Sequence, residues 1–410
     1  MKDTLLRKSV VLTLFVALLA PANGQWYSTY LKKAEKQTRF LIDQSPERKM
    51  IPRTYSSKTG VEYVRVEDWT SGFFPGVLWL LHYHTNNDYW KKEAIHFTEL
   101  LAPIQHFTKH HDVGFMIMSS YGLGFALNND PAYREVIINS ANALITRYRE
   151  KAGTIQSWEK RVSRTGVDWE CPVIIDNLMN LELLFKVAQL TGDQRYYDIA
   201  IRHADNTLKN HIRPDKSTYH LVNYDLETGE VTDRDTWQGF SRNSTWARGQ
   251  AWGIYGFTMC YRESGEQRYL QTAIELADFF LNHKNLPKDK IPVWDFNAGE
   301  EGYVPDWDFR NANGNLQSRD VSAAAIVASA LLELSTLSDE LHSKYYTVAE
   351  TMLKNLSSPK YFARYQTNGG FILKKSVGNM PRGLEVDVPL NYADYYYLEA
   401  LHRYKQMNKK

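Results

Sequence analysis

Two aspartates in the sequence have neighbours that suit acid–base chemistry. Asp176 follows the apolar run Pro-Val-Ile-Ile at residues 172–175, and Leu178 and Met179 come soon after it. Burial among apolar side chains disfavours a charged carboxylate and raises its pKa. Because a general acid needs a pKa near the operating pH, we expect Asp176 to be the proton donor. The residue types alone predict a buried helix cap equally well.

The second aspartate, Asp112, lies in the segment His-Asp-Val-Gly-Phe-Met of residues 111–116. Gly114 leaves room for the backbone beside it. Two carboxylates close together push one of the two pKa values upwards. We therefore expect Asp112 to stay ionised as a fixed partner and Asp176 to carry the proton.

A cluster of rings and donors surrounds Arg248. Trp246, Gln250 and Trp252 lie within four residues of it. A guanidinium forms a natural fork for a carboxylate or a sulfate, and tryptophan rings can form the walls of a sugar site. Core packing is the commoner fate of a tryptophan pair. The combination favours a substrate-binding site formed by these four residues.

Other chemistries have weaker signals. His220 and Gln238 lie in one long loop, where a histidine can hydrogen-bond a ligand or simply be solvated. Histidines four residues apart with a glutamate between them would predict a metal site, and the sequence has no such pair. No phosphate loop, dinucleotide glycine motif or Gly-x-Ser-x-Gly occurs either. We expect neither a metal nor a cofactor.

The elements that must position these residues are helices. Apolar residues recur at spacings of three and four, and strand-like alternation is scarce. The pattern predicts a single catalytic unit over residues 23–410 with about twelve helices. Their expected spans are 26–45, 72–86, 88–107, 115–128, 131–150, 174–191, 194–212, 246–264, 266–284, 321–336, 340–356 and 391–406.

Short polar turns alternate with long loops along this series. The long loops lead into the even-numbered helices, whose first turns carry the aspartates and the Arg248 cluster. This alternation predicts a closed ring of hairpins, with one helix of each pair inside and the long loops at one end. The first turns of the inner helices then meet at one mouth, where their positive ends favour an anionic ligand.

The first 22 residues have the character of a signal peptide. Lys2, Arg7 and Lys8 precede an apolar run over residues 9–19, and small residues follow it. We expect residues 1–22 to be removed and the protein to be exported to the periplasm. The leader carries a net charge of +2, the formal charge of the whole chain, so the mature chain is neutral. This balance gives no basic surface for nucleic acid and no polybasic patch for a membrane.

Six segments, in this order and spacing, make the chain resemble the unsaturated glucuronyl hydrolases of glycoside hydrolase family 88. They are residues 68–73 (DWTSGF), 111–116 (HDVGFM), 175–179 (IDNLM), 246–252 (WARGQAW), 322–326 (SAAAI) and 392–401 (YADYYYLEAL). The resemblance covers nearly the whole mature chain. It implies an all-α fold, an (α/α)6 barrel, and the removal of a 4,5-unsaturated uronic acid from the non-reducing end of an oligosaccharide made by a polysaccharide lyase.

The resemblance also implies roles for residues. Asp176 protonates C4 of the vinyl ether and activates the water that adds at C5, and Asp112 assists and contacts the sugar. The substrate contacts of the family correspond to His220, Gln238, Arg248 and Trp252, with Trp69 as a wall. The only partner implied is an unsaturated uronate-containing oligosaccharide.

Three alternatives remain open from the sequence. An unsaturated rhamnogalacturonyl hydrolase shares the barrel and the chemistry, although the segment at Asp112 favours the glucuronyl group. An inverting glycosidase could use Asp112 and Asp176 as base and acid. A sugar-binding protein without activity would keep the tryptophans and Arg248 but would not need Asp176. We expect any sulfate subsite in the loops 213–245 and 285–320. The sequence indicates neither the second sugar nor the oligomeric state.

Overall fold

A computed structural model describes residues 26–45, 48–305 and 315–408. The predicted leader, residues 1–22, lies outside this range. The α-helices are α1 (Trp26–Asp43), α2 (Phe73–Thr85), α3 (Asp88–Glu99), α4 (Val113–Ile117), α5 (Leu123–Asn128), α6 (Pro131–Ile145), α7 (Leu181–Thr191), α8 (Gln194–His211), α9 (Ala247–Ser264), α10 (Gln267–Asn282), α11 (Val321–Leu334), α12 (Asp339–Leu356) and α13 (Asn391–Met407). Shorter turns are η1 (Ala102–His106), η2 (Met118–Gly122), η3 (Ile175–Asn180), η4 (Asn368–Gly370) and η5 (Met380–Arg382).

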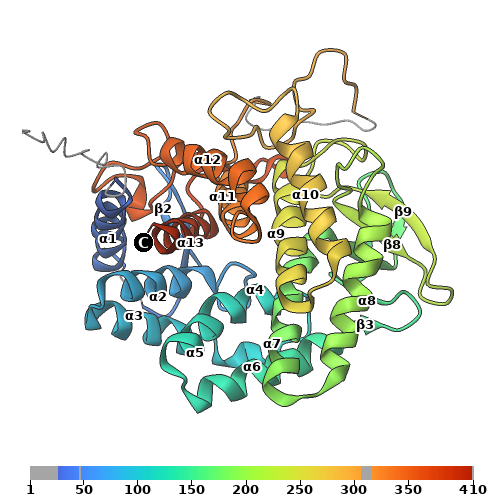
Figure 1. Cartoon of the computed structure of the whole chain (residues 1–410), viewed down its shortest axis with the longest axis horizontal. Helices are drawn as coiled ribbons and strands as arrows, with labels where there is room; N and C mark the ends of the chain where they lie inside the picture. The colour runs from blue at the N-terminus through green and yellow to red at the C-terminus, as the bar shows by residue number, and fades with distance from the viewer. Residues whose placement is uncertain (1–25, 46–47, 306–314, 409–410) are drawn as a thin grey trace, which may run out of the picture.

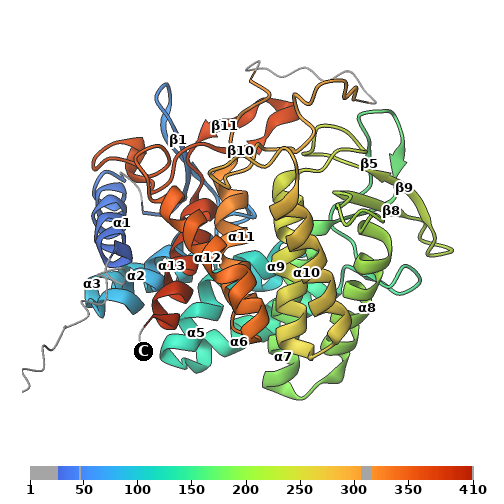
Figure 2. The same ribbon diagram turned by 45° about the horizontal axis from the view of Figure 1, so that its top comes forward.

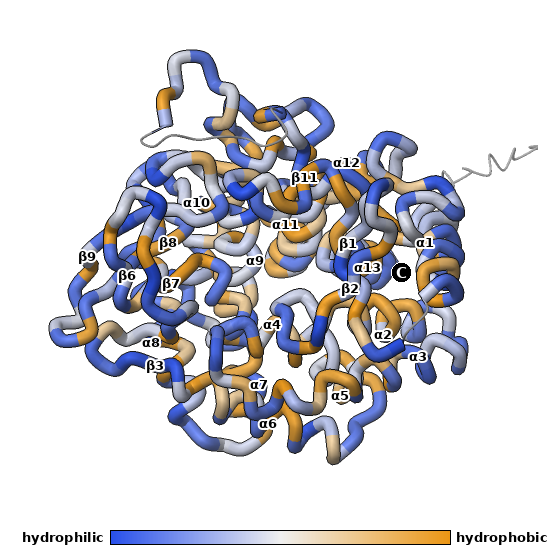
Figure 3. Tube along the Cα trace, turned by 180° about the vertical axis from the view of Figure 1, so that it is seen from behind, coloured by the Kyte–Doolittle hydropathy of each residue, from blue (hydrophilic) through white to orange (hydrophobic). Residues whose placement is uncertain are grey.

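The helices form a double-layered ring, as the sequence predicted. Figure 1 shows the chain running once round the molecule, so that α13 returns beside α1 and α2. The inner helices α9 and α11 are buried along most of their length, whereas the outer helices α8 and α10 bury one face only. In Figure 3 hydrophobic stretches lie along α2 and α11. An outer helix needs only one apolar stripe because its other side faces water.

Contacts between neighbouring inner helices close the ring at their first turns. Arg248 of α9 forms an ion pair with Asp320, the N-cap of α11, at 2.7 Å. Asn391 of α13 donates a hydrogen bond to the carbonyl oxygen of Thr70, just before α2, at 3.1 Å. These contacts join residues far apart in the sequence at one mouth. The expected (α/α)6 barrel is therefore confirmed.

Three predicted helices are interrupted. Residues 88–107 divide into α3 and η1, where Pro103 stands in the first turn of η1. Residues 115–128 are broken by the π-helical turn η2, where the hydroxyls of Ser119 and Ser120 donate to the carbonyls of Phe115 and Met116 at 2.6 Å. Such bonds compete with the regular helix ladder. Residues 174–191 begin as a strand and a 3-10 turn before α7 starts.

Between the helices, the described residues form eleven short strands that the sequence did not reveal. They are β1 (Ile51–Ser56), β2 (Gly60–Val64), β3 (Tyr148–Arg149), β4 (Thr154–Ile155), β5 (Arg161–Val162), β6 (Asp168–Trp169), β7 (Cys171–Ile174), β8 (Leu221–Tyr224), β9 (Val231–Asp235), β10 (Ser376–Asn379) and β11 (Leu384–Val388). All pairs are antiparallel, and β7, β8 and β9 form the one three-stranded sheet of the described chain. Figure 2 shows the strands gathered at one end of the helices. Strands of two to six residues are too short to show a clear alternation.

None of the described helices has both the length and the apolar character that a membrane span requires. One large hydrophobic core extends from Leu31 in α1 to Tyr404 in α13. Cys171 and Cys260 are both buried and both free.

Candidate active site

The antiparallel sheet at the mouth brings Asp176 and His220 together. In the pairing of β7 with β8, Ile174 lies opposite Leu221. One residue further on, the amide of Ile175 donates to the carbonyl oxygen of His220 at 2.9 Å. Asp176 follows at once in the 3-10 turn η3. The strand that the sequence did not reveal is therefore what sets the position of this carboxyl group.

The carboxyl group of Asp176 is buried and unpaired. Its residue is 6% exposed, and no group in the described part of the chain hydrogen-bonds its Oδ2. Burial raises the pKa of Asp176 to about 7, and the negative charge of Asp112 acts in the same direction. The positive charge of Arg248 opposes this rise. The apolar neighbours of Asp176 in the sequence predicted such an environment.

His220 faces Asp176 in a fixed protonation state. Its Nδ1 accepts a hydrogen bond from the amide of Trp237 at 2.9 Å, so Nδ1 carries no proton. Burial holds the pKa of His220 well below its usual value, so the ring is neutral and its proton is on Nε2. Nε2 lies 3.9 Å from Oδ2 of Asp176. The ring therefore presents an N–H donor to the space beside the carboxyl group.

Asp112 has the opposite electrostatic character. Its carboxylate lies 3.2 Å from Nδ1 of His110 and 3.3 Å from Nε2 of His111. Burial opposes its ionisation, but the two histidines outweigh burial and lower the pKa of Asp112. Asp112 therefore remains ionised while Asp176 holds its proton near neutral pH.

A chain of hydrogen bonds orients the ring of His111, which lies beside Asp112. The amide of Phe115 donates to Oδ1 of Asn180 at 2.9 Å, and Nδ2 of Asn180 lies 3.2 Å from Nδ1 of His111. Since the Asn180 amide donates, Nδ1 of His111 accepts, and the proton of this ring is on Nε2, facing Asp112. Burial lowers the pKa of His111 to about 4, which keeps the ring neutral. A Cβ at Gly114 would lie 2.4 Å from Cα of Asn180, which explains the glycine.

Arg248 does not offer the free fork that the sequence predicted. Its Nη1 donates to Oδ2 of Asp320 at 2.7 Å and to the carbonyl of Val377, and its Nη2 donates to the carbonyl of Gly378 at 2.7 Å. Only its Nε lacks a hydrogen-bond partner among the described residues. The guanidinium is thus a buried, already paired charge that acts on Asp176 through its field.

Trp246 packs against two of the site residues. Its ring lies 4.7 Å from the ring of His220 and 4.6 Å from the guanidinium carbon of Arg248. It is 3% exposed, so it packs between these two groups and offers little surface to a substrate. A Cβ at Gly249 would lie 2.7 Å from the Trp246 ring, so only glycine fits there.

Trp252 and Trp69 belong to an aromatic wall. Trp252 is fully buried against Phe115, at 5.1 Å between ring centres, and its indole lies close enough to Asp176 to lower the pKa of that carboxyl group. Trp69 is half-buried and lies 4.9 Å from the ring of Tyr392. The sequence did not single out Tyr392, whose buried hydroxyl has no hydrogen-bond partner within the described ranges.

The two glutamines have different surroundings. Gln238 is half-buried at the mouth, and its Nε2 donates to the carbonyl of Gly378 at 3.3 Å. Gln250 was predicted to bind substrate, but its Nε2 is held by backbone carbonyls, and its buried Oε1 has no hydrogen-bond partner among the described residues. Its Nε2 donates to the carbonyls of Lys216 and Leu276 at 3.0 and 3.1 Å, so the side chain faces α10 and not the mouth. Two positions after Arg248 on a helix, it points to a different face.

A cationic and aromatic cluster at the mouth was missed. The guanidinium carbon of Arg161 lies 4.2 Å from the ring of Trp158 and 5.4 Å from that of Trp237. That of Arg164 lies 5.0 Å from Trp237. Burial lowers the pKa of both arginines, and the positive charge of Arg382 acts in the same direction. The cluster lies partly in the loop 151–173, whose aromatic content was its only signal in the sequence.

Nowhere in the described ranges do three His, Cys, Asp or Glu side chains gather as a metal site requires. The chemistry that this geometry supports is proton transfer: one carboxyl group holds its proton near pH 7, and its neighbour is ionised. A closed ring of helical hairpins with two such carboxylates at its mouth defines an acid–base enzyme of the (α/α)6 barrel class.

The comparisons with known proteins identify the family. The Glycosyl Hydrolase Family 88 model matches residues 34–263. An unsaturated glucuronyl hydrolase of Formosa agariphila is 43% identical over 384 residues, which cover 93% of this chain and 90% of the relative. An unsaturated chondroitin disaccharide hydrolase of Streptococcus pyogenes is 35% identical, with 92% and 91% covered. The chain belongs to glycoside hydrolase family 88.

Solved structures agree with this assignment. The crystal structure of an unsaturated glucuronyl hydrolase specific for heparin superposes with a TM-score of 0.86 at 41% identity and covers 94% of this chain and 98% of that one. A mutant of the unsaturated glucuronyl hydrolase of Streptococcus agalactiae, complexed with dGlcA-GalNAc6S, gives a TM-score of 0.75 at 29% identity and covers 92% and 91%.

Proposed function

We propose that the protein removes a 4,5-unsaturated uronic acid from the non-reducing end of lyase-generated oligosaccharides. The observation that carries this proposal is the buried, unpaired carboxyl group of Asp176, whose pKa is about 7, beside the neutral N–H of His220. About half of such carboxyl groups hold their proton at pH 7, so the same group can give a proton and take one back.

The chemistry needs one carboxyl group and one water. Asp176 donates its proton to C4, and the electron pair of the double bond forms the new C–H bond. Water attacks C5 and gives its proton to the Asp176 carboxylate, which restores the acid. The hemiketal at C5 opens to a ketone, and the freed hemiacetal at C1 releases the second sugar. The net change is the addition of one water.

Fixed charges favour the cationic centre that develops at C5. The ionised Asp112 supplies negative charge close to Asp176, and its two histidines hold it in place. The N–H of His220 and the unpaired Nε of Arg248 offer donors to the uronate carboxylate. Preorganised dipoles of this kind cost no reorganisation during the reaction.

We propose further that the second sugar carries an anionic group. Burial lowers the pKa of Arg161 and Arg164, and the positive charge of Arg382 lies close enough to both to act in the same direction. An anion between these arginines would relieve the repulsion of their charges. The rings of Trp158 and Trp237 beside them suit the apolar face of a sugar.

The experiment offers the enzyme unsaturated disaccharides made by lyases, sulfated and unsulfated, and their saturated counterparts. The proposal expects loss of the ultraviolet absorbance of the double bond and no attack on saturated sugars. Reaction in D₂O should place deuterium at C4. Cleavage of saturated glycosides would instead support an inverting glycosidase. Binding without turnover would support a sugar-binding protein, and a preference for rhamnose-linked substrates would support a rhamnogalacturonyl hydrolase.

We also propose export to the periplasm, on the basis of the leader at residues 1–22. Mass spectrometry of the mature N-terminus tests this, since the proposal expects a protein that starts near residue 23.

A further inference from the structure

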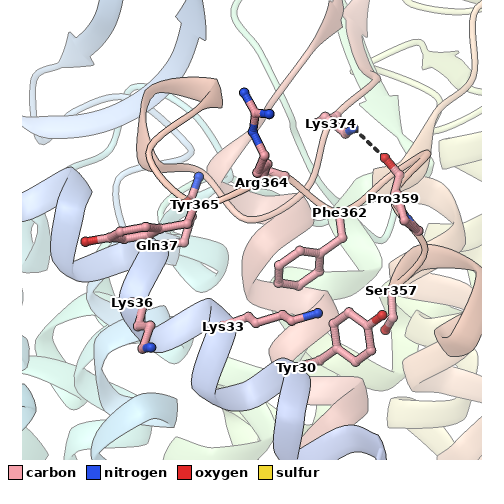
Figure 4. Close-up of a pocket in the computed structure, with 11 residues that line it drawn as sticks. Tyr30, Lys33, Lys36, Gln37, Ser357, Pro359, Phe362, Arg364, Tyr365 and Lys374 are labelled. Atoms are coloured by element: carbon pink, nitrogen blue, oxygen red, sulfur yellow. Dashed lines mark hydrogen bonds between the residues drawn. The ribbon is translucent and has the colours of Figure 1, made fainter.

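A cavity lies on the outside of the barrel, and neither Asp112 nor Asp176 lines it. It has a volume of about 360 Å³, between α1 and the loop that follows α12. Figure 4 shows its lining, which includes none of the active-site residues described above. Cavities of this size can hold small ligands.

The cavity is surrounded by unpaired positive charge. Its lining includes four cations: Lys33, Lys36, Arg364 and Lys374. None of the four has an ion-pair partner within 4.0 Å in the part of the chain that the structure describes. The whole chain has 49 basic and 47 acidic residues, so this excess is local. Lys374 donates instead to the carbonyl of Pro359 at 2.7 Å, and burial and the charge of Lys375 lower its pKa.

Aromatic rings line the same cavity. The rings of Tyr30 and Phe362 meet edge to face at 5.2 Å, and Nζ of Lys33 lies 4.4 Å from the centre of Tyr30. Tyr365 also lines the cavity and is 55% exposed, so its ring is accessible to a ligand. In Figure 4 the Lys33 side chain extends along the cavity towards Tyr30 and Phe362. The site thus combines flat apolar surfaces with several cations.

The walls of the cavity are fixed to each other. Gln37 of α1 is buried, and its Nε2 donates to the carbonyls of Thr367 and Phe371 at 2.6 and 3.1 Å. Its Oε1 accepts from the amide of Gln366 at 3.2 Å. Asp394 of α13 accepts from two amides of the same loop. Because helix and loop are joined in this way, the cavity is formed before any ligand binds.

We infer that this cavity is a non-catalytic binding site for an acidic oligosaccharide, which carries sulfate or uronate groups. Sugar rings present apolar C–H faces that suit tyrosine, while their anionic groups suit unpaired lysine and arginine. The inference rests on the proposed function for its choice of ligand, since an enzyme that acts on acidic oligosaccharides meets them as substrates. Such a site would hold the oligosaccharide at the protein surface while the mouth remains free.

The probe is a saturated chondroitin sulfate hexasaccharide, which has no double bond and cannot be consumed. Its binding is measured by calorimetry for the wild type and for a Lys33→Ala/Arg364→Ala variant. The matched control, Lys32→Ala/Lys49→Ala, removes the same charge from exposed side chains outside the cavity. Loss of two charge-assisted contacts should weaken binding about tenfold or more in the cavity variant, against less than about twofold in the control.

Two further measurements separate the explanations. A Tyr365→Ala variant should bind the hexasaccharide more weakly but should bind an oligoglutamate peptide of equal charge as well as the wild type does. Tight binding of the peptide, with the hexasaccharide unaffected by loss of Tyr365, would overturn the inference. Equal weakening by the cavity and control variants would also overturn it. Turnover of an unsaturated disaccharide should be unchanged in all these variants, which shows that they fold. If turnover is absent throughout but hexasaccharide binding depends on the cavity, the proposed function fails and this site remains.

Discussion

Nε2 of His220 lies 3.9 Å from Oδ2 of Asp176, and neither atom has a hydrogen-bond partner elsewhere in the described chain. Buried polar atoms are usually paired. The amide of Trp237 fixes the proton of His220 on Nε2, so the two orphan groups face a common space. A ligand that accepts from His220 and receives a proton from Asp176 would satisfy both.

The pH dependence of kcat/KM should follow Asp176. The acid form donates the proton, so kcat/KM should fall above about pH 7, where Asp176 ionises. The decline approaches tenfold per pH unit. Initial rates with an unsaturated disaccharide between pH 4 and 9 measure it. A flat profile up to pH 9 would contradict the assignment of the acid.

Asp176→Asn should stabilise the protein at high pH. An unfolded aspartate ionises near pH 3.8, whereas Asp176 in the folded protein holds its proton up to about pH 7. The protonated Asp176 carboxyl group therefore makes its full contribution to the free energy of unfolding below about pH 4, and this contribution is lost as the pH rises to about 7. Asparagine avoids this loss, so the variant should gain up to about 4 kcal/mol in unfolding free energy at pH 8 and little at pH 4. Denaturant unfolding at both pH values compares them, and an equal gain at both would argue against a raised pKa.

Asn180→Ala should impair catalysis although Asn180 contacts no substrate. It removes the donor that fixes the proton of His111, and His111 in turn holds Asp112. Loss of such an orienting contact typically costs 10-fold to 100-fold in activity, and we expect it in kcat more than in KM. The low-pH limb of kcat should also move upwards because Asp112 loses stabilisation of its charge. If the low-pH limb of kcat is unchanged and the variant is only less stable, Asn180 has a packing role alone.

Arg248→Met should destabilise the protein and shift the pKa of Asp176. It leaves Asp320 buried without its cation, and breaking a buried pair costs about 3–5 kcal/mol. The charge of Arg248 lowers the pKa of Asp176, so its loss should move the high-pH limb of kcat/KM above 7. Urea unfolding and the pH profile measure the two effects. If the high-pH limb stays in place, Arg248 does not act on the acid.

Gln250→Leu and Gln238→Ala form a contrasting pair. Gln250 bonds to the backbone beside α10, so its loss should reduce stability by about 1–3 kcal/mol and leave KM unchanged. Gln238 lies at the mouth, so its loss should raise KM with little change in stability. A raised KM in the Gln250 variant would show that the face assigned to it is wrong.

The sequence predicted the barrel because long helices have a strong period, and because turns and loops of different length alternate along the chain. It predicted the environment of Asp176 because the apolar neighbours are adjacent in the chain. It did not reveal that Arg248 is paired, because its partner Asp320 lies 72 residues away and the residues next to an arginine in the sequence do not indicate whether it has a partner. It did not reveal that Nε2 of Gln250 bonds to the backbone beside α10, because nearness in sequence does not give the helix face.

The strands at the mouth were beyond sequence patterns for a related reason. β7 has four buried residues with no polar alternation, so Cys171–Ile174 resembles the start of a helix. Its partner β8 lies some fifty residues further on, and only their pairing sets His220 beside Asp176. Long-range pairing of this kind leaves no local signal.

The most direct test is the loss of double-bond absorbance with an unsaturated disaccharide, for the wild type and for Asp176→Asn. Asparagine keeps the shape of the side chain but has no acidic proton. We expect the wild type to bleach the double bond and the variant, although folded, to be slower by several orders of magnitude. Bleaching by the variant at a comparable rate would contradict the central claim that Asp176 is the proton donor.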